Sequence, residues 1–181
     1  MRPNEIDLNK GGNKMTKLVP DDFEVPLELN LPAFILRPLT VEHLEIDYEA
    51  VMSSKTRLRQ VFCVDDYWPS DQMTLEEDRR DLIWHEDEFE RRSSFAYTVL
   101  SLSGSRCLGC VYFFSAQVAD YDAEVYFWVR DDEFLNGLDS ILYNTVKEWL
   151  KTSWPFRNPA FPGQDIPWKD WTGKRLQGPE S

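Results

Sequence analysis

The sequence lacks the features that define several large protein classes. Its 181 residues contain no apolar run near the roughly 20 residues that a membrane-spanning helix requires. The polar stretch over residues 1–17 has no apolar core of the kind found in secretion signals. Three cysteines are too few for a disulfide scaffold. We therefore expect a reduced, cytoplasmic protein with no membrane partner.

Motifs of several enzyme classes are also missing. There is no P-loop, no dinucleotide-binding glycine pattern and no G-x-S-x-G nucleophile elbow. Cys107 and Cys110 have CxxC spacing, but the pattern places them on a strand, where residues three apart point to opposite faces. We therefore expect that their sulfurs share neither a metal nor a disulfide, and we predict no metal site.

Positive charge is scarce. The chain has 32 acidic and 20 basic residues, which gives a formal net charge of −12. Nucleic acids and anionic membranes bind clustered positive charge, so we expect neither as a partner. The acidic balance favours solubility and is compatible with a cationic substrate such as an amine. A solvated acidic surface accounts for the same charge.

Hydrophobic periodicity predicts the element order β-α-α-β-β-β-α. Residues 33–39 read as a strand, and Thr40 caps a helix that continues to about residue 54. Thr74 and Glu77 form a capping box for a second helix over residues 75–92. Two β-rich runs flank residues 103–105 as a hairpin, residues 123–129 form a further strand, and a helical stripe runs from Leu138 to Trp149.

The ends of the chain differ from this centre. We predict a disordered polar tail over residues 1–17 and one domain over residues 18–152. Residues 153–181 contain five prolines, which block long helices and central strands. We expect an extended segment, with one short strand near Phe156 at most, whose aromatic side chains pack on the domain: Trp154, Phe156, Phe161, Trp168 and Trp171.

The element order and three motifs resemble the GNAT N-acetyltransferase superfamily. "FILRPLTVEHLEIDYEAV" resembles its first strand and helix, "CLGCVYFF" its third strand and "AEVYFWV" its fourth strand. The resemblance covers residues 33–151. It implies an α/β (α+β) fold with a mostly antiparallel central sheet flanked by helices, shortened at its C-terminal side. It also implies an acyltransferase that moves an acetyl group from acetyl-CoA to a small-molecule or peptide amine.

In this family the pyrophosphate of acetyl-CoA lies on the loop after strand four, with the pattern [Q/R]-x-x-G-x-[G/A]. Here "FLNGLD" occupies the loop, and Gly137 matches its first glycine. Amide groups at a helix N-terminus attract such an anion. The resemblance implies these cofactor-binding residues: Trp128, Val129, Arg130, Leu135, Asn136, Gly137, Leu138 and Asp139.

The same loop departs from the family pattern. Phe134 replaces the Gln or Arg, and Asp139 replaces the second small residue. Carboxylates gather where the pyrophosphate would lie, opposed only by Arg130, and each like-charge contact costs on the order of 1 kcal/mol; they belong to Asp131, Asp132, Glu133 and Asp139. A structural turn without cofactor is the alternative interpretation.

Glu124 aligns with the general base of histone-type members, and a strand glutamate facing solvent is the alternative. Asp122 and Tyr126 share its strand face and could position the amine. Tyr67 and Trp68 lie in the segment where the family builds its acceptor site, and a loop anchored by Trp68 is the alternative. His85 is the remaining titratable candidate, with a structural histidine on a helix face as the alternative.

No position matches the tyrosine that the family uses to protonate the leaving thiolate. Two alternatives to the plain enzyme therefore stay open. One is a non-catalytic GNAT-like binding or interaction module. The other is a homodimer in which the C-terminal segments complete each other's sheets.

Overall fold

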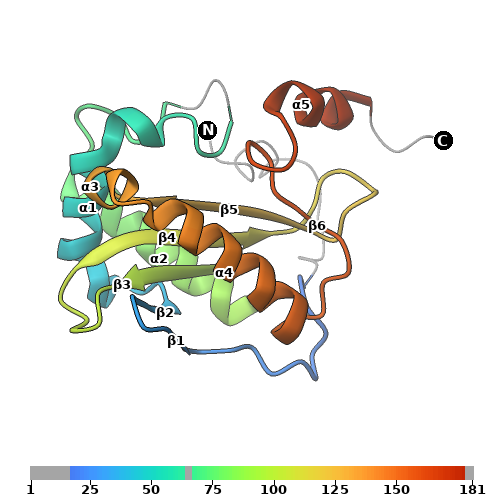
Figure 1. Cartoon of the computed structure of the whole chain (residues 1–181), viewed down its shortest axis with the longest axis horizontal. Coiled ribbons are helices and arrows are strands. Elements are labelled where there is room, and N and C mark those ends of the chain that lie inside the picture. The colour runs from blue at the N-terminus through green and yellow to red at the C-terminus, as the bar shows by residue number, and fades with distance from the viewer. Residues whose placement is uncertain (1–16, 64–66, 178–181) are drawn as a thin grey trace.

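The structure, a computed structural model, describes residues 17–63 and 67–177. Helices pack on both faces of one sheet (Figure 1). In chain order the elements are β1 (Leu29–Asn30), β2 (Ile35–Pro38), the 3-10 turn η1 (Val41–His43), α1 (Leu44–Leu58), α2 (Leu75–Arg91), β3 (Phe95–Leu100), β4 (Cys107–Phe114), β5 (Ala123–Val129), α3 (Asp131–Leu135), α4 (Leu138–Ser153), β6 (Pro159–Ala160) and α5 (Trp168–Gln177).

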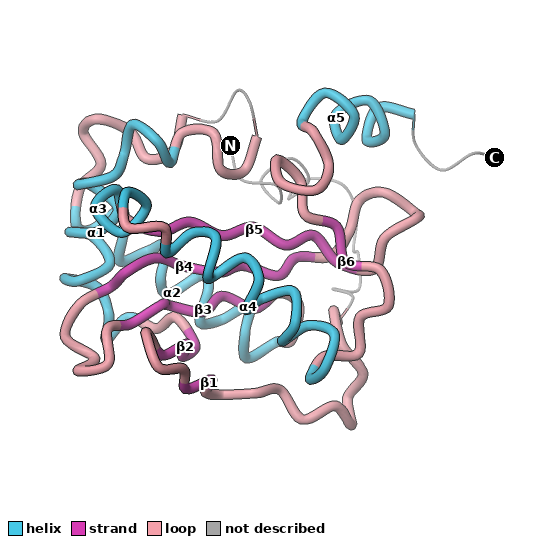
Figure 2. The backbone as a smooth tube through the Cα atoms, viewed as in Figure 1, coloured by secondary structure: helices cyan, strands magenta, loops and turns pink. Residues whose placement is uncertain are grey.

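The six strands follow the order of the chain across the sheet. Each neighbouring pair from β1 to β5 is antiparallel, and β6 pairs with β5 in parallel. Figure 2 shows α4 crossing one face of the sheet while α1 and α2 cover the other. The predicted fold class, a mostly antiparallel sheet flanked by helices, is confirmed.

Strand alternation separates two cores. Strand residues such as Val111, Phe113 and Phe127 pack with α4 in one apolar cluster. Their neighbours Tyr112 and Trp128 pack in a second cluster with α1 and α2. The central strands β3, β4 and β5 are therefore buried on both sides, along their whole length.

Local signals set the helix starts. The Thr74 hydroxyl accepts the Glu77 amide at 3.2 Å, and the Glu77 carboxylate accepts the Thr74 amide at 2.7 Å. This confirms the predicted capping box of α2. Helix α1 extends to Leu58, four residues beyond the predicted end near Ser54. Its buried stripe includes Asp47, a charged residue that the apolar periodicity did not select.

The prediction that the Cys107 and Cys110 side chains point to opposite faces is wrong. The register between β3 and β4 shifts, so that Val99 pairs with Gly109 while Leu100 pairs with Cys107. The extra residue reverses the alternation within the CxxC segment. Both thiols consequently lie on the face covered by α1.

The prediction that the C-terminal segment is extended is wrong for part of its length. It forms β6 beside β5 and then the helix α5, which begins immediately after Pro167. Proline is tolerated at the first positions of a helix because the amide there needs no intrahelical partner. Trp154, Phe161 and Trp171 are buried.

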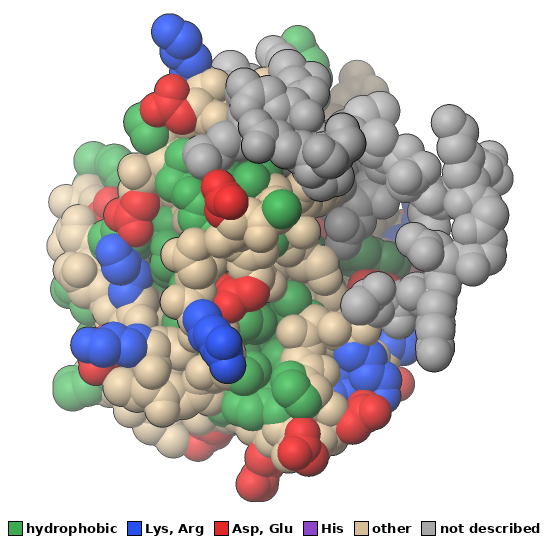
Figure 3. Space-filling view, turned by 90° about the vertical axis from the view of Figure 1, so that its right-hand side faces the viewer, with side chains coloured by type: hydrophobic (Ala, Val, Ile, Leu, Met, Phe, Trp, Pro, Cys, Tyr) green, Lys and Arg blue, Asp and Glu red, His purple; other side chains and the backbone are tan. Residues whose placement is uncertain are grey.

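The predicted tail over residues 1–17 lies outside the described residues except for Lys17. Among the described residues, no helix combines the length and the apolar content needed to span a lipid bilayer. On the face shown in Figure 3, acidic and basic side chains are interspersed rather than separated into patches of one sign.

Candidate active site

The edge of β5 opens into a cavity. Strand β6 pairs with β5 only at Ala123 and Glu124, so within residues 17–63 and 67–177 no strand pairs with the remainder of that edge. A cavity of about 230 Å³ lies along it. Its walls come from β5, from the end of α1 and from the C-terminal segment, and include Arg57, Gln60, Val125, Tyr126, Phe127, Trp128, Val129, Phe134, Asp139, Gly163, Gln164 and Trp168.

The open edge carries backbone polar groups. The Arg130 amide donates to the Leu108 carbonyl on β4 at 2.9 Å. By the alternation of an antiparallel ladder, the backbone groups of Phe127 and Val129 point the other way, towards the cavity. The Val129 carbonyl accepts a hydrogen bond from Arg57, which confirms this direction for Val129. An extended ligand could pair with this edge as a further strand would.

The first turn of α4 is an uncapped helix N-terminus beside the cavity. Gly137 is its cap residue with φ of 81°, a left-handed conformation that favours glycine, and it offers no side chain to the helix amides. The Asn136 and Gly137 amides donate to the Glu133 and Phe134 carbonyls at 3.1 and 3.0 Å. The amides of Leu138 and Asp139 have no intrahelical acceptor at this position. Of the predicted anion-binding amides, those in the first turn of α4 therefore remain available to an anion, and those of Asn136 and Gly137 do not.

The acidic loop is neutralised by more cations than the sequence suggested. Asp131 pairs with Arg57 at 2.8 Å, and Glu133 pairs with Arg106 at 2.5 Å. Asp132 pairs with both Arg106 and Arg130. The expectation that Arg130 alone opposes these carboxylates is wrong. Although partial burial acts against it, the neighbouring Arg130 and Arg106 guanidinium groups hold the pKa of Asp132 below its ordinary value.

The Arg130 side chain already forms ion pairs within the protein. Its guanidinium binds both carboxylate oxygens of Glu49 on α1, at 2.5 and 2.8 Å. The hydrogen bonds that Arg130 donates to Glu49 raise the pKa of Arg130 and lower that of Glu49. By contrast, Asp139 lines the cavity and forms no ion pair with any described residue. It is the one carboxylate of the predicted loop that faces the cavity unneutralised.

Glu124 does not face solvent, which excludes the alternative stated for it. Its side chain is 0% exposed. One carboxylate oxygen accepts the Gln117 amide at 2.8 Å, and the other accepts the Tyr126 hydroxyl at 2.7 Å. Glu124 and Tyr126 therefore form a buried dyad on the face of β5 that carries the second core. The hydroxyl connects the carboxylate to the ring that lines the cavity.

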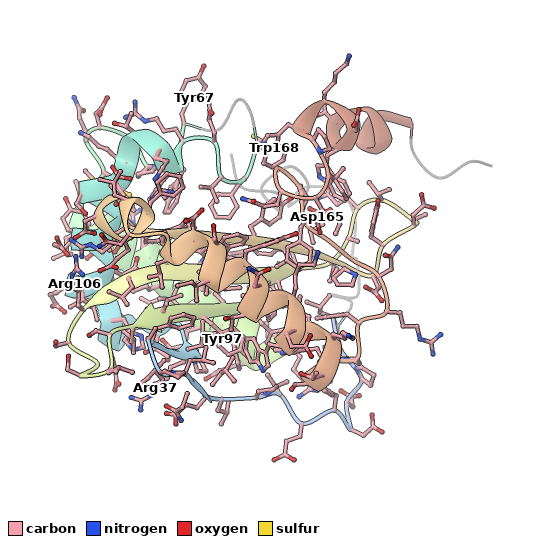
Figure 4. All side chains as sticks on the ribbon, viewed as in Figure 1. Arg37, Tyr67, Tyr97, Arg106, Asp165 and Trp168 are labelled. Atoms are coloured by element: carbon pink, nitrogen blue, oxygen red, sulfur yellow. The ribbon has the colours of Figure 1, made fainter. Side chains whose placement is uncertain are left out.

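Aromatic rings surround Tyr126. Phe62 lies 5.5 Å from it and Phe114 lies 6.1 Å from it, measured between ring centroids. Trp168 stacks on it at 6.3 Å with an interplanar angle of 12°. Figure 4 shows Trp168 between α5 and the sheet. The described C-terminal segment thus contributes one wall of the site.

The other predicted acceptor residues do not all join this site. The exposed Asp122 carboxylate accepts the Arg157 and Asn158 amides, so it anchors the segment that leads to β6. Tyr67 is 79% exposed and projects away from the sheet (Figure 4). Trp68 packs edge-on against Phe62 at 5.6 Å, next to Tyr126.

His85 is buried on α2, with its ring 5.1 Å from that of Tyr112. Among the predicted cofactor residues, Trp128, Val129 and Asp139 line the cavity. Leu138 is buried against the sheet, while Leu135 and Asn136 are exposed.

Sequence reasoning missed Arg57, Gln60 and Gln164, which also line the cavity. Helical spacing offered a signal for the first of these. Ser54 and Arg57 lie one turn apart near the end of α1, and both reach the same loop: the Ser54 hydroxyl accepts the Asp131 amide at 2.9 Å, and Arg57 binds the Asp131 carboxylate.

Comparisons with known proteins are consistent with this geometry. Scans against protein-family models and curated proteins gave no match. Solved structures did match. The ribosomal-protein-S5-alanine acetyltransferase from Vibrio fischeri is 10% identical, with 84% of this chain and 81% of that chain aligned and a TM-score of 0.58.

Two further structures match with a TM-score of 0.52. RimL, a ribosomal L7/L12 alpha-N-protein acetyltransferase, is 18% identical over 70% of this chain and 64% of that chain. The microcin C7 self-immunity acetyltransferase MccE, solved with acetyl-CoA and AMP, is 12% identical over 66% of this chain and 63% of that chain. This chain thus matches less than two thirds of either protein. The likeness establishes the fold, which is that of the GNAT acetyltransferases.

Proposed function

We propose that this chain, which has the GNAT fold, is an acetyl-CoA-dependent N-acetyltransferase that acts on an amine. The observation that carries the proposal is the edge of β5 beyond Glu124, which pairs with no strand of the described chain and lines a cavity that Tyr126 of the Glu124–Tyr126 dyad also lines. Non-catalytic binding through the same cavity is the competing reading, and cofactor and turnover measurements separate the two.

The residues present fit acetyl-CoA, which would supply the acetyl group as a thioester. The backbone of Phe127 and Val129 offers an extended edge for the pantetheine amides. The uncapped first turn of α4 offers amides to the pyrophosphate. The arginine partners of Asp131, Asp132 and Glu133 remove most of the repulsion that the loop composition implied.

In this proposal Glu124 is the general base. The amine proton passes to the Tyr126 hydroxyl while that hydroxyl passes its own proton to the Glu124 carboxylate, to which it already donates a hydrogen bond. Backbone amides at the open edge of β5 stabilise the developing negative charge on the thioester oxygen. Tyr126, Trp68 and Trp168 form the aromatic surroundings in which the acceptor amine is held.

Isothermal titration with acetyl-CoA and CoA tests the proposal at its first step. We expect saturable binding of both ligands. Trp168→Ala should weaken it, since this ring lines the cavity, whereas Tyr67→Ala is the matched control because Tyr67 is 79% exposed. Absence of binding at millimolar acetyl-CoA would exclude the transferase.

Replacing Glu124 tests the chemical step. Glu124→Gln should lower turnover about 100-fold or more, the usual contribution of a positioned base. Acetyl-CoA affinity should stay within twofold, because the carboxylate contacts Gln117 and Tyr126 rather than the α4 seat. Glu90→Gln, at an exposed position on α2, is the control. Equal turnover in both variants would remove Glu124 from the mechanism, whereas cofactor binding without turnover in the wild type would leave a binding module.

The proposal includes a reducing compartment such as the cytoplasm, since Cys63, Cys107 and Cys110 are free thiols. The homodimer with exchanged C-terminal segments stays a prediction. The chain's own β6 already takes the place beside β5 that such an exchange would fill.

A further inference from the structure

Three potential metal ligands meet between α1 and β4, away from the open edge of β5. The Asp47 carboxylate and the Cys107 and Cys110 thiols place one ligand atom each within 4.8 Å of one another. The Cys110 sulfur lies 3.3 Å from Asp47 Oδ1, and the Cys107 sulfur lies 3.7 Å from the same atom. All three side chains are buried.

The backbone of β4 builds this convergence. The register shift against β3 turns both thiols of the CxxC segment towards α1. Gly109, between them, passes so close to β5 that an added Cβ would lie 2.0 Å from the Trp128 carbonyl oxygen. The Thr98 hydroxyl supports the site from β3, 3.6 Å from the Cys107 sulfur.

The printed hydrogen-bond partners of the buried Asp47 carboxylate, among the residues that the structure describes, are the two thiols. Thiols are weak hydrogen-bond donors, and a buried carboxylate with only such partners is costly. Burial raises the pKa of Asp47 to about 6. Burial also raises the pKa of Cys110 well above its ordinary value, with the neighbouring Cys107 and Asp47 adding to the effect. The nearby cation, Arg130, is already bound to Glu49 and Asp132.

We propose that Asp47, Cys107 and Cys110 bind one divalent metal ion of the zinc class. Cysteine sulfur and carboxylate oxygen are both ligand atoms of Zn²⁺, and in a tetrahedral site a sulfur and an oxygen ligand lie about 3.6 Å apart. The observed 3.3 and 3.7 Å match that separation. The Gly109 carbonyl oxygen, 3.4 Å from the Cys107 sulfur, offers a fourth donor.

Binding converts both thiols to thiolates. Each sulfur forms a bond to the metal, and its proton leaves for solvent, so that two protons are released for each ion bound. The two positive charges of the ion replace those of the two protons, so the net charge of the site stays that of the Asp47 carboxylate. Because the ligands come from α1 and β4, the ion would fix α1 on the sheet. It is a structural site with no step in acetyl transfer.

Cobalt substitution tests this site with a readout independent of activity. The cluster is closed to solvent, so the full chain is unfolded with reductant and chelator and then refolded with Co²⁺. We expect one Co²⁺ per chain, with a sulfur-to-cobalt charge-transfer band and visible bands of tetrahedral intensity that Zn²⁺ abolishes by displacement. Cys107→Ser and Cys110→Ser should each weaken or remove the charge-transfer band. Cys63→Ser, a half-buried cysteine outside the cluster, should leave it unchanged.

Native mass spectrometry of the wild-type chain refolded with Zn²⁺ gives a second measurement that does not depend on whether the serine variants fold. One retained ion per chain, and a higher Tm with Zn²⁺ than with chelator, are the expected results. A folded wild-type chain that retains no metal would overturn the proposal and leave the thiols as hydrogen-bond donors to Asp47. So would a charge-transfer band that Cys63→Ser removes and the other two variants keep.

Discussion

The two faces of the sheet are built from the same strands and differ in chemistry. The face under α4 is almost wholly apolar, and its one buried phenol, Tyr97, donates its hydroxyl to the Pro26 carbonyl at 2.7 Å. The face under α1 and α2 buries most of the polar strand side chains, namely Thr98, Cys107, Cys110, Tyr112, Glu124 and Tyr126.

Because neighbouring residues of a strand point to opposite faces, one set of side chains builds the apolar core and the next set carries the polar groups. Burial of apolar surface stabilises the α4 face without any requirement for partners. On the other face each buried polar atom needs a partner or a ligand. The Glu124–Tyr126 dyad and the Asp47 cluster both occur there. Substitutions on the two faces should therefore fail in different ways, and three of them test this.

The largest effect is expected on the apolar face. Trp154 packs against Phe95, Phe113 and Trp149, with ring centroids 5.2, 4.9 and 5.6 Å away. Trp154→Ala should lower the unfolding free energy by about 3–5 kcal/mol through the cavity it leaves, measured by urea denaturation. Tyr67→Ala should change it by less than about 0.5 kcal/mol. A loss below 1 kcal/mol in the first variant would show that the segment after α4 adds little to this core.

An intermediate effect is expected for Asp47, and it should depend on pH. Burial raises the pKa of Asp47 from 3.8 to about 6, so the folded chain binds this proton more tightly than the unfolded chain does. Its contribution to stability is full below about pH 4 and is lost as the pH rises to about 6. The difference between the two pKa values corresponds to about 3 kcal/mol of unfolding free energy.

Asp47→Asn removes this titration. In the presence of chelator, the wild type should lose about 3 kcal/mol relative to the variant between pH 4 and pH 7. Denaturation at a series of pH values measures the difference, with Asp87→Asn at an exposed position on α2 as the control. If the unfolding free energies of wild type and Asp47→Asn depend on pH in the same way, the pKa of Asp47 is not raised by burial.

The smallest effect concerns the first turn of α4, where the apolar face meets the proposed site. Asp139 lines the cavity without an ion-pair partner among the described residues. Asp139→Asn should tighten acetyl-CoA binding about fivefold at low salt, which corresponds to roughly 1 kcal/mol. Asp22→Asn, an exposed substitution in the segment before β1, is a charge-matched control. Unchanged affinity would place the pyrophosphate away from this turn.

Local patterns predicted most of the framework. The strand over residues 123–129 and the α2 capping box agree with the structure because each depends on neighbouring residues. The prediction for the CxxC side chains was wrong because one extra residue in β4 breaks the alternation of period two. The shift is visible only in the pairing with β3, which the sequence of β4 does not contain. The sequence did not predict helix α5, because the high proline content of this segment argued against a helix, whereas α5 begins at Trp168, immediately after Pro167.

The candidate site was predicted less well. Glu124 was found through the resemblance to the family's general base, and Tyr126 was found because it lies two residues further along the same strand face. The partners that neutralise the acidic loop were not, because they are remote in sequence: Arg57 and Asp131 are 74 residues apart, and Arg106 and Glu133 are 27 apart. Charge counted along a loop overstates the repulsion whenever such cations return from another element.

Trp168 belongs to α5 and also lines the cavity beside β5. Occupancy of the cavity and the placement of α5 are consequently linked equilibria, and the coupling acts equally in both directions. A ligand that binds better with Trp168 on Tyr126 favours the docked helix, and a contact that moves α5 changes the affinity for that ligand by the same factor. A molecule that binds α5 would therefore change the ligand affinity of the cavity without entering it.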